Sequence, residues 1–265
     1  HQISGKECCI GISCGGPLDS GRGVILSPPN LPGWDQVPIV SYLEQRLDMD
    51  ARLKNDADAC ALAEWRYGAG RGCRHMIFLT FGTGLGAGLV LNGRLYEGAC
   101  GMAGEAGHVR LAEEGPVGYE KAGSFEGFCS GGGIARLARS MAEDALKAGR
   151  PVSYMKEGGL DDITARDVAE AAEMGCADAG EVLAVSGRYF GRGLAMLVDI
   201  LNPERIVAGG IYARAGRFLK DEMEKELRRE ALPASVNACC ILPCGLGEQI
   251  GDYGAVMAAL EMWEE

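Results

Sequence analysis

Short apolar runs that end in glycine clusters alternate along this chain with longer stretches whose apolar residues recur every three or four positions. Runs of the first kind predict buried strands, and the longer spacing predicts helices that bury one face. Strands are expected at residues 8–13, 23–26, 52–56, 76–81, 87–91, 94–96, 206–208 and 238–242. Helices are expected at 39–47, 57–67, 132–148, 165–174 after an N-cap at Thr164, 180–201, 216–229 and 254–263.

The order of these elements predicts the fold class. Strands come first in hairpins and later alternate with helices, an order typical of an α/β fold with a mixed sheet covered by helices. Asn92-Gly93 is a preferred two-residue hairpin turn, because both residues tolerate positive φ. Glycines at 68, 70 and 72 would let two lobes hinge, so a domain boundary is expected near residue 70.

Composition and charge exclude some classes of function. The 265 residues are 47% hydrophobic, with a net charge of -11 that is not collected into blocks. Such an acidic balance opposes nucleic-acid binding, although backbone amides and a helix terminus could still hold a small anion such as a nucleotide. No apolar run reaches the ~20 residues of a membrane span, so a soluble protein without a membrane partner is expected.

The cysteines indicate a reducing compartment. There are 11 of them, an odd number at irregular spacings, which fits a reduced cytoplasmic protein better than a disulfide framework. Most of them are expected to act as small buried hydrophobic residues.

Asn55-Asp56 closes an expected strand directly before a helix. Side chains at such a position in mixed folds project into a cleft, where a carboxylate could accept a proton from a hydroxyl group. The adjacent amide could hold a second hydroxyl group. Asn and Asp are also preferred helix N-caps, and the pair alone does not decide between the two interpretations.

Two glycine clusters are candidates for binding a flat or anionic ligand. Gly82-Thr83-Gly84-Leu85-Gly86 joins two expected strands, so its backbone N–H groups and the Thr83 hydroxyl could approach a phosphate. It lacks the lysine of a Walker motif and precedes a strand, so it is not a P-loop. Gly209-Gly210 follows a buried strand and could lie against a ligand. Each cluster could equally be an ordinary turn.

Glu105 and His108 lie three residues apart among small residues in G-E-A-G-H. Two polar groups in this arrangement could face one polyhydroxylated ligand. A lone histidine is more often a structural residue, which is the alternative interpretation.

Together, Asn55-Asp56, G-T-G-L-G, A-G-E-A-G-H and V-A-G-G-I resemble the ROK family of bacterial sugar kinases and sugar-responsive repressors, in the same order and at similar intervals. P-P-N-L-P-G-W at 28–34 and G-R-L-Y-E-G at 93–98 extend the resemblance, which runs from about Ile10 to the C-terminus.

The resemblance implies a two-lobed actin/hexokinase-like (ribonuclease H-like) α/β fold with mixed sheets and an incomplete first lobe. Residues 1–70 would be the remnant of the N-terminal lobe, with the final helix 253–265 packing back on it. Residues 71–252 would form the C-terminal lobe, which binds nucleotide and part of the sugar. The implied ligands are a hexose or N-acetylhexosamine, ATP and Mg²⁺, and the implied assembly is a homodimer.

Roles for single residues follow from the same resemblance. Asp56 would be the general base toward a sugar hydroxyl, usually the one on C6. The sugar contacts would be Asn55, Glu105, His108 and Glu126. The nucleotide contacts would be Gly82, Thr83 and Gly84 at the phosphates, and Gly209 and Gly210 at the adenosine.

The sequence departs from the family at two places. Val117, Tyr119 and Ser124 stand where the family commonly has zinc-binding cysteines, and His108 alone cannot make a closed four-ligand site. No zinc is therefore expected, with packing around Tyr119 and Phe125 in its place. The family's D-x-G-G-T phosphate loop should lie some tens of residues upstream of Ile10 and is absent from this sequence. A protein without this loop is expected to turn over orders of magnitude more slowly, whereas a longer protein that contains it is expected to be an ordinary kinase.

Two alternatives to a sugar kinase stay open. One is a non-catalytic sugar-binding or regulatory protein related to the family's repressors, or a truncated, inactive kinase. The other is a structural domain with coincidental glycines, which the shared motif order disfavours.

Overall fold

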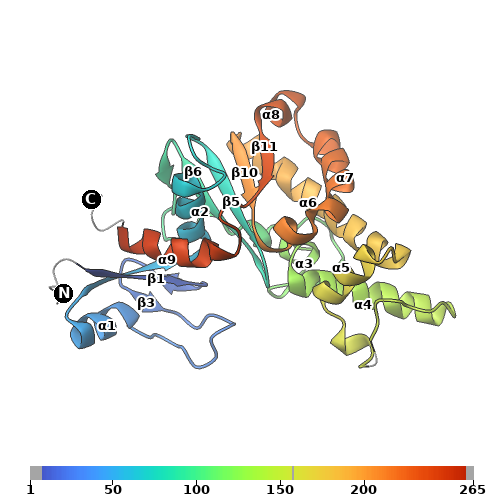
Figure 1. The fold of residues 1–265 in the computed structure, drawn as a ribbon, viewed down its shortest axis with the longest axis horizontal. Coiled ribbons are helices and arrows are strands. Elements are labelled where there is room, and N and C mark those ends of the chain that lie inside the picture. Colours follow the sequence, from blue (N-terminus) through green and yellow to red (C-terminus); the bar gives the residue numbers. More distant parts are fainter. Residues whose placement is uncertain (1–7, 157, 261–265) are drawn as a thin grey trace. The chain divides into compact units, whose positions relative to one another are not determined.

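The computed structural model describes residues 8–156 and 158–260, which divide into two compact units (Figure 1). The first unit contains the chain up to residue 78 together with 87–104 and the chain from 244 onward. The second contains 79–86 and 105–243. The described helices and strands form mixed sheets flanked by helices, as expected for an α/β fold.

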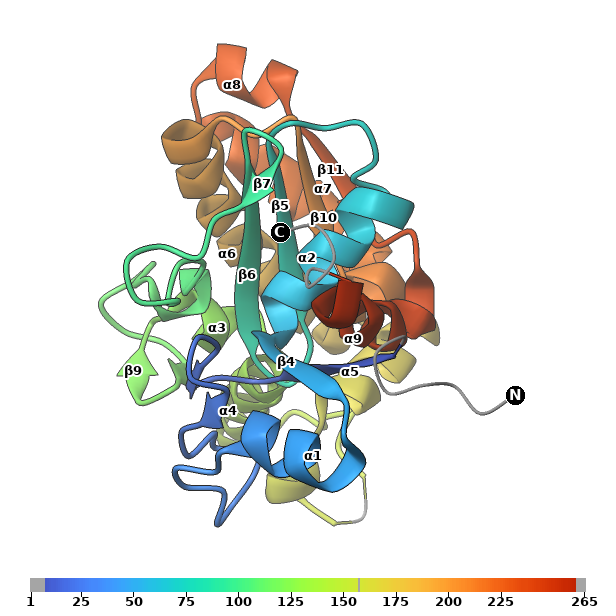
Figure 2. The same ribbon diagram turned by 90° about the vertical axis from the view of Figure 1, so that its left-hand side faces the viewer.

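The first unit is built on a parallel strand pair covered by helices. Its elements are β1 (Cys9–Cys14), β2 (Leu18–Asp19), β3 (Val24–Ile25), α1 (Ile39–Leu47), β4 (Asp50–Asn55), α2 (Asp56–Tyr67), β7 (Arg94–Leu95), a 3-10 turn (Gly247–Gln249) and α9 (Ile250–Leu260). The register of β1 with β4 places Cys14 opposite Asn55. Helix α9 packs against β1 and α2 (Figure 2), so a segment near the C-terminus completes this unit.

Residues 87–104 belong to the first unit, beyond the expected boundary near residue 70. Part of β6 (Leu85–Leu91) lies directly on α2: an ideal Cβ added to Gly88 would be 2.4 Å from the carbonyl oxygen of Ala57. Only a residue without a side chain allows this approach, and it explains why the strand packs with α2. The lobe boundaries expected from the sequence remain a proposal.

The carboxyl group of Glu64, on α2, ties distant segments of the first unit together. The residue is completely buried. Its Oε2 accepts hydrogen bonds from Ala69 N at 2.7 Å and Gly245 N at 3.1 Å, and its Oε1 accepts one from Leu246 N at 2.9 Å. Three backbone donors thus satisfy one buried acceptor, as burial of a carboxyl group requires.

Replacing Glu64 with glutamine is therefore expected to lower the free energy of unfolding by about 3 kcal/mol. The amide keeps one acceptor oxygen but turns an N–H group toward backbone donors. Urea denaturation followed by circular dichroism measures the change. The exposed Glu181, changed to glutamine, is the control and should leave stability unchanged. A loss below about 1 kcal/mol for Glu64→Gln would contradict this role.

The second unit combines strands with a layer of longer helices. Its elements are a 3-10 turn (Ala106–His108), β8 (Val117–Gly118), β9 (Lys121–Ala122), α3 (Phe125–Phe128), α4 (Gly131–Lys147), a 3-10 turn (Leu160–Asp162), α5 (Ala165–Glu173), α6 (Ala177–Leu201), β10 (Arg205–Ala208), α7 (Gly210–Glu230), α8 (Pro233–Ala238) and β11 (Cys240–Pro243). β5 (Met76–Phe81) and β6 contribute residues to both units. The five-stranded sheet has the order β11-β10-β5-β6-β7.

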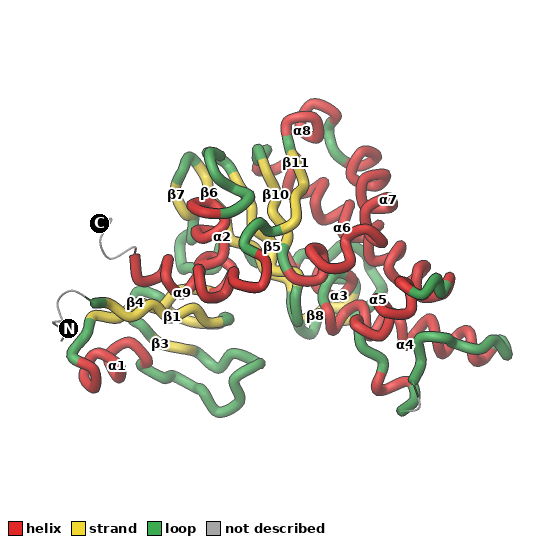
Figure 3. The backbone as a smooth tube through the Cα atoms, in the orientation of Figure 1, coloured by secondary structure: helices red, strands yellow, loops and turns green. Residues whose placement is uncertain are grey.

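Helices α6 and α7 run alongside each other, as the tube in Figure 3 shows. Arg192 on α6 donates to the buried Glu226 on α7 at 2.5 Å. At the core of this unit the ring of Phe190 contacts those of Phe81, Phe125 and Tyr212. These contacts fix the end of β5 and the start of α7, beside the candidate nucleotide residues, and the start of α3, which carries Glu126.

Most expected elements are confirmed, and α1 has the expected bounds. Thr164 is the N-cap of α5, with a complete capping box. Several boundaries were wrong: α6 begins at Ala177 and not at 180, α7 begins at Gly210 and not at 216, residue 238 ends α8 so that β11 begins at Cys240, and α9 begins at Ile250 and not at 254. Asp56, expected to end a strand, is the first residue of α2. Residues 261–263 of the last expected helix lie outside the described residues.

The cysteines are less buried than expected. All 11 are free thiols: three are buried, two exposed and six half-buried. Burial raises the pKa of Cys60 to about 12, so this thiol stays protonated at neutral pH. None of the described helices combines the length and the apolar character needed to cross a membrane.

Candidate functional site

Asn55 and Asp56 lie at the junction of β4 and α2, as the sequence predicted. Asn55 is the N-cap of α2, and its Oδ1 accepts a hydrogen bond from Ala57 N at 2.9 Å. Oδ1 of Asp56 accepts from the same N–H group at 2.8 Å. The capping interpretation is thus confirmed. It involves one carboxylate oxygen of Asp56, so capping and proton transfer do not exclude each other.

The second carboxylate oxygen of Asp56 is directed toward the loop after β1. An ideal Cβ on Gly15 would be 3.8 Å from Asp56 Oδ2 and 3.6 Å from Asn30 Nδ2. A Cβ on Gly16 would be 3.4 Å from Asn55 Nδ2. The first unit therefore gathers two amides and a carboxylate around bare backbone, an arrangement suited to several hydroxyl groups.

The surroundings of Asp56 alter its acidity. The residue is exposed, yet desolvation by the protein around the carboxyl group raises its pKa. Hydrogen bonds from the backbone N–H groups of Ala57 and of Asp56 itself oppose this increase. A raised pKa makes a carboxylate a stronger base, which suits general base catalysis near neutral pH.

The second unit brings the predicted polar residues of its N-terminal part together. Glu105 precedes the 3-10 turn that ends at His108, and both residues are exposed. An ideal Cβ on Gly107, between them, would be 3.3 Å from Cβ of Glu126. Oε2 of Glu126 accepts a hydrogen bond from Leu85 N at 3.0 Å, so this carboxylate also supports the glycine hairpin.

The glycine clusters converge on Gly82. Gly131 N, at the start of α4, donates to the carbonyl oxygen of Gly82 at 2.7 Å. Gly210, which starts α7 with a φ of 56°, lies so close to Phe81 that an added Cβ would be 2.0 Å from its carbonyl oxygen. Two long helices thus begin at one hairpin, and helix N-termini favour anions.

Space remains beside this hairpin. Among the described residues, no heavy atom lies within 4 Å of an ideal Cβ on Gly82, and Thr83 is exposed. Gly84 is more crowded, because its Cβ would be 2.8 Å from Glu126 Oε2. The hairpin is therefore more open at Gly82 than at Gly84.

The segment after His108 does not offer a zinc site. Val117, Tyr119 and Ser124 carry no imidazole, thiolate or carboxylate, and the described part of the chain contains no group of three or more potential metal ligands. A closed tetrahedral site needs four such ligands, so this donor set does not fit zinc. Metal analysis of the purified protein would test the prediction directly.

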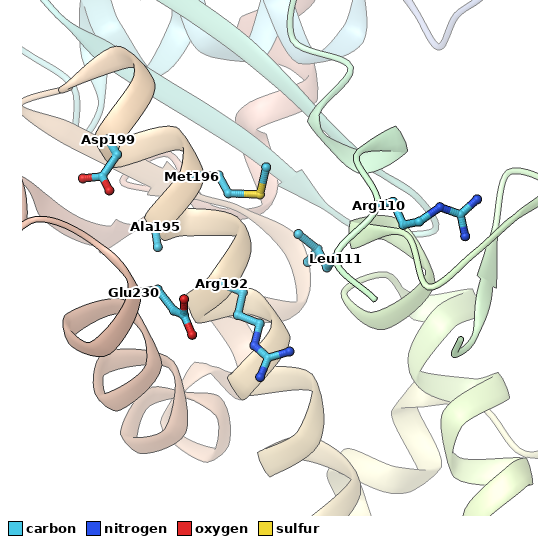
Figure 4. A pocket seen from close by; sticks show the side chains of 7 residues that line it. All are labelled: Arg110, Leu111, Arg192, Ala195, Met196, Asp199 and Glu230. Carbon is cyan, nitrogen blue, oxygen red and sulfur yellow. The ribbon is translucent and has the colours of Figure 1, made fainter. Parts of the chain in front are cut away.

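A cavity of about 470 Å³ in the second unit has none of these residues in its lining (Figure 4). It is lined by Arg110, Leu111, Arg192, Ala195, Met196, Asp199 and Glu230. Its charged groups already have partners: Arg192 binds Glu226, Asp199 Oδ1 accepts from Leu232 N at 3.0 Å, and Glu230 binds Arg229. We therefore assign no ligand to it.

Sequence reasoning missed two residues. Asn30 was noticed only as part of P-P-N-L-P-G-W, and its approach to Gly15 depends on tertiary structure. Gly131 lay just before the helix expected at 132–148, and its bond to Gly82 could not be foreseen from the sequence. Three consecutive glycines at a helix start are the signal that could have drawn attention to it.

The chain is similar to known proteins over most of its length. The model of the ROK family matches residues 1–262. A glucokinase of Halalkalibacterium halodurans is 35% identical over 253 residues, which are 94% of this chain and 76% of that protein.

Two solved structures are similar. One is a ROK family glucokinase from Streptomyces griseus in complex with glucose and AMPPNP, with a TM-score of 0.80 and 32% identity, covering 95% of this chain and 81% of that one. The other is a ROK family transcriptional regulator, a homolog of the E. coli MLC protein, with a TM-score of 0.79 and 26% identity, covering 93% of this chain and 61% of that one.

The expected actin/hexokinase-like fold is confirmed by these neighbours. The chain therefore belongs to the ROK family, on the branch of its sugar kinases.

Proposed function

We propose that this chain transfers the γ-phosphoryl group of ATP to a hydroxyl group of a hexose or N-acetylhexosamine, the hydroxyl on C6. The observation that carries the nucleotide part is the convergence of two helix N-termini on the open hairpin at Gly82. Phosphoryl transfer depends mainly on positioning and on charge stabilisation, which such a cradle supplies. The kinase relatives support the same reaction class.

Each predicted residue has a role in this proposal. Asp56 accepts the proton of the attacking hydroxyl group. The other sugar contacts are Asn55, Glu105, His108 and Glu126. The nucleotide contacts are Gly82, Thr83, Gly84, Gly209 and Gly210. Mg²⁺ would arrive with the nucleotide and be held largely by its phosphate oxygens. The reaction requires that the sugar hydroxyl and the γ-phosphate meet during turnover.

A sugar panel tests the proposal. Isothermal titration with glucose, mannose, fructose and the N-acetyl sugars identifies the ligand, and a coupled assay for ADP measures turnover with ATP and Mg²⁺. The 6-deoxy form of the bound sugar should bind but accept no phosphate. Phosphorylation of the 6-deoxy sugar would refute the C6 assignment, and failure to bind any sugar or nucleotide would refute the function.

A second candidate is a sugar-binding or regulatory protein without catalysis. The likeness to a transcriptional regulator favours keeping it. In the same experiments this candidate predicts sugar binding without ADP formation, with or without an intact Asp56.

The activity should fall as the pH is lowered. A general base must be ionised. Desolvation by the surrounding protein raises the pKa of the Asp56 carboxyl group, so protonation begins at a higher pH than for an ordinary aspartate with a pKa of ~3.9. We expect kcat/KM to decline on the acid side with a midpoint above that value. Rates measured from about pH 4 to 8 check this. A flat profile in protein that remains folded would contradict it.

The homodimer and the cytoplasmic location remain proposals. Free thiols are compatible with a reducing compartment. Ile200 and Leu232 are 73% and 63% exposed, and the hydrogen bond from Leu232 N to Asp199 Oδ1 brings the chain segments that carry them together. Exposed apolar residues on neighbouring segments suit contact with a second copy. Light scattering during gel filtration measures the assembly directly.

A further inference from the structure

Two cationic side chains brace the segment that follows His108. Lys121 Nζ, on β9, donates to the carbonyl oxygen of His108 at 2.8 Å. Arg110 Nη1 donates to the carbonyl oxygen of Ala122 at 2.7 Å. The first bond runs from β9 to the segment that contains His108, and the second runs from that segment to β9. Together they cross-link the two sides of the loop.

The backbone of the same segment is paired along its length. Leu111 N donates to the carbonyl oxygen of Gly123 at 2.8 Å, and Phe125 N donates to that of Val109 at 2.8 Å. Between them, Arg110 and Ser124 form an antiparallel bridge. The loop closes through Tyr119 and Glu120, both with positive φ, in the β8–β9 hairpin.

The imidazole of His108 lies against this hairpin. Its ring meets the ring of Tyr119 edge-on, with centroids 6.1 Å apart and an interplanar angle of 78°. Arg110 is turned away from Asp199 and Glu230 in Figure 4, which agrees with its bond to the Ala122 carbonyl group. The imidazole ring of His108, its carbonyl group and the side chain of Arg110 thus all contact residues 119–122.

These contacts occupy the stretch in which the ROK family commonly binds zinc. A metal there would tie the histidine segment to the loop that follows, and the side chains at 117, 119 and 124 cannot bind one. The bonds from Lys121 and Arg110 make the same connection with charged donors and neutral acceptors, a strong class of hydrogen bond.

We infer that Lys121 and Arg110 are positioning residues, which hold His108 in its sugar-binding orientation without a metal. The sugar-binding role of His108 rests on the proposed function. Loss of the two hydrogen bonds weakens sugar binding in the ground state and the transition state alike, so it raises KM more than it lowers kcat.

The double variant Lys121→Met/Arg110→Met tests the inference. We expect the KM for the sugar to rise on the order of tenfold while kcat changes less than about threefold. The single variant Lys121→Arg, in which Arg110 is intact, keeps a charged donor and should have most of the sugar affinity of the native protein. The matched control is Lys147→Met/Arg150→Met, two exposed cations at the end of α4, which should leave both constants unchanged.

Hydrogen exchange tests the hydrogen bonds of Lys121 and Arg110 independently of the proposed function. Backbone amides of residues 106–125 should exchange faster in the double variant than in the native protein, whether or not any sugar is phosphorylated. A zinc-selective chelator should alter neither this exchange nor the KM of the native protein. Unchanged exchange and KM in the double variant would overturn the inference, as would stoichiometric zinc whose removal loosens residues 106–125.

Discussion

Replacing Asp56 with asparagine is expected to lower kcat by a factor on the order of 10²–10⁴ while leaving the protein folded. The amide cannot accept the proton of the attacking hydroxyl group. It does keep an oxygen in the position of Oδ1, which accepts the hydrogen bond from Ala57 N. Asn55 remains the N-cap of α2 in this variant. The chemical role is therefore removed and the structural role is kept.

Single-turnover rates with saturating sugar and ATP, together with thermal unfolding, check this prediction. Sugar affinity from titration should remain within a few fold of the native value. Asp50→Asn, an exposed change at the other end of β4, is the matched control and should have native activity. Retention of more than about a tenth of the native rate would exclude Asp56 as the base. Extensive unfolding would instead favour a purely structural role in capping.

Replacing Gly82 with valine is expected to lower kcat/KM for ATP on the order of 10²-fold. The new side chain would fill the open side of the hairpin, next to the N-termini of α4 and α7, where the phosphates are proposed to bind. Because no described heavy atom lies within 4 Å of an ideal Cβ there, the change should be tolerated by the fold. Sugar affinity should also be retained.

Initial rates over a range of ATP concentrations measure this effect, and nucleotide titration separates binding from turnover. Gly180→Val on α6 is the control, since no described atom lies within 4 Å of its Cβ either and it is far along the chain from the hairpin. Gly210→Ala would be less informative, because the clash with Phe81 and the positive φ should unfold it. Native ATP kinetics in Gly82→Val would contradict the proposal that the phosphates bind at this hairpin.

The sequence predicted those elements whose signal is local. The helix at Ile39–Leu47 has its own amphipathic spacing, and Thr164 and Asp167 make a capping box three residues apart. The start of α7 was missed because Gly210 has a positive φ and resembles a turn, although it is already part of the helix. The pattern of apolar positions cannot distinguish these two cases.

The candidate site was predicted to a similar degree. Asn55 and Asp56 were found from their place between a strand and a helix, yet only the three-dimensional structure shows that both accept a hydrogen bond from Ala57 N. The approach of Asn30 to Gly15, and that of Gly131 to Gly82, join residues far apart in sequence. Such pairs follow from tertiary packing, and a single sequence carries no direct sign of them.

The buried carboxyl group of Glu64 also sets an order of events during translation. Its amide donors at Gly245 and Leu246 follow it by 181 and 182 residues. At ribosomal speeds of about 5–20 residues per second, roughly 10–35 s separate their synthesis. By then the ribosome has already made the uninterrupted stretch 105–243, so the second unit has its whole chain before the first can close around Glu64.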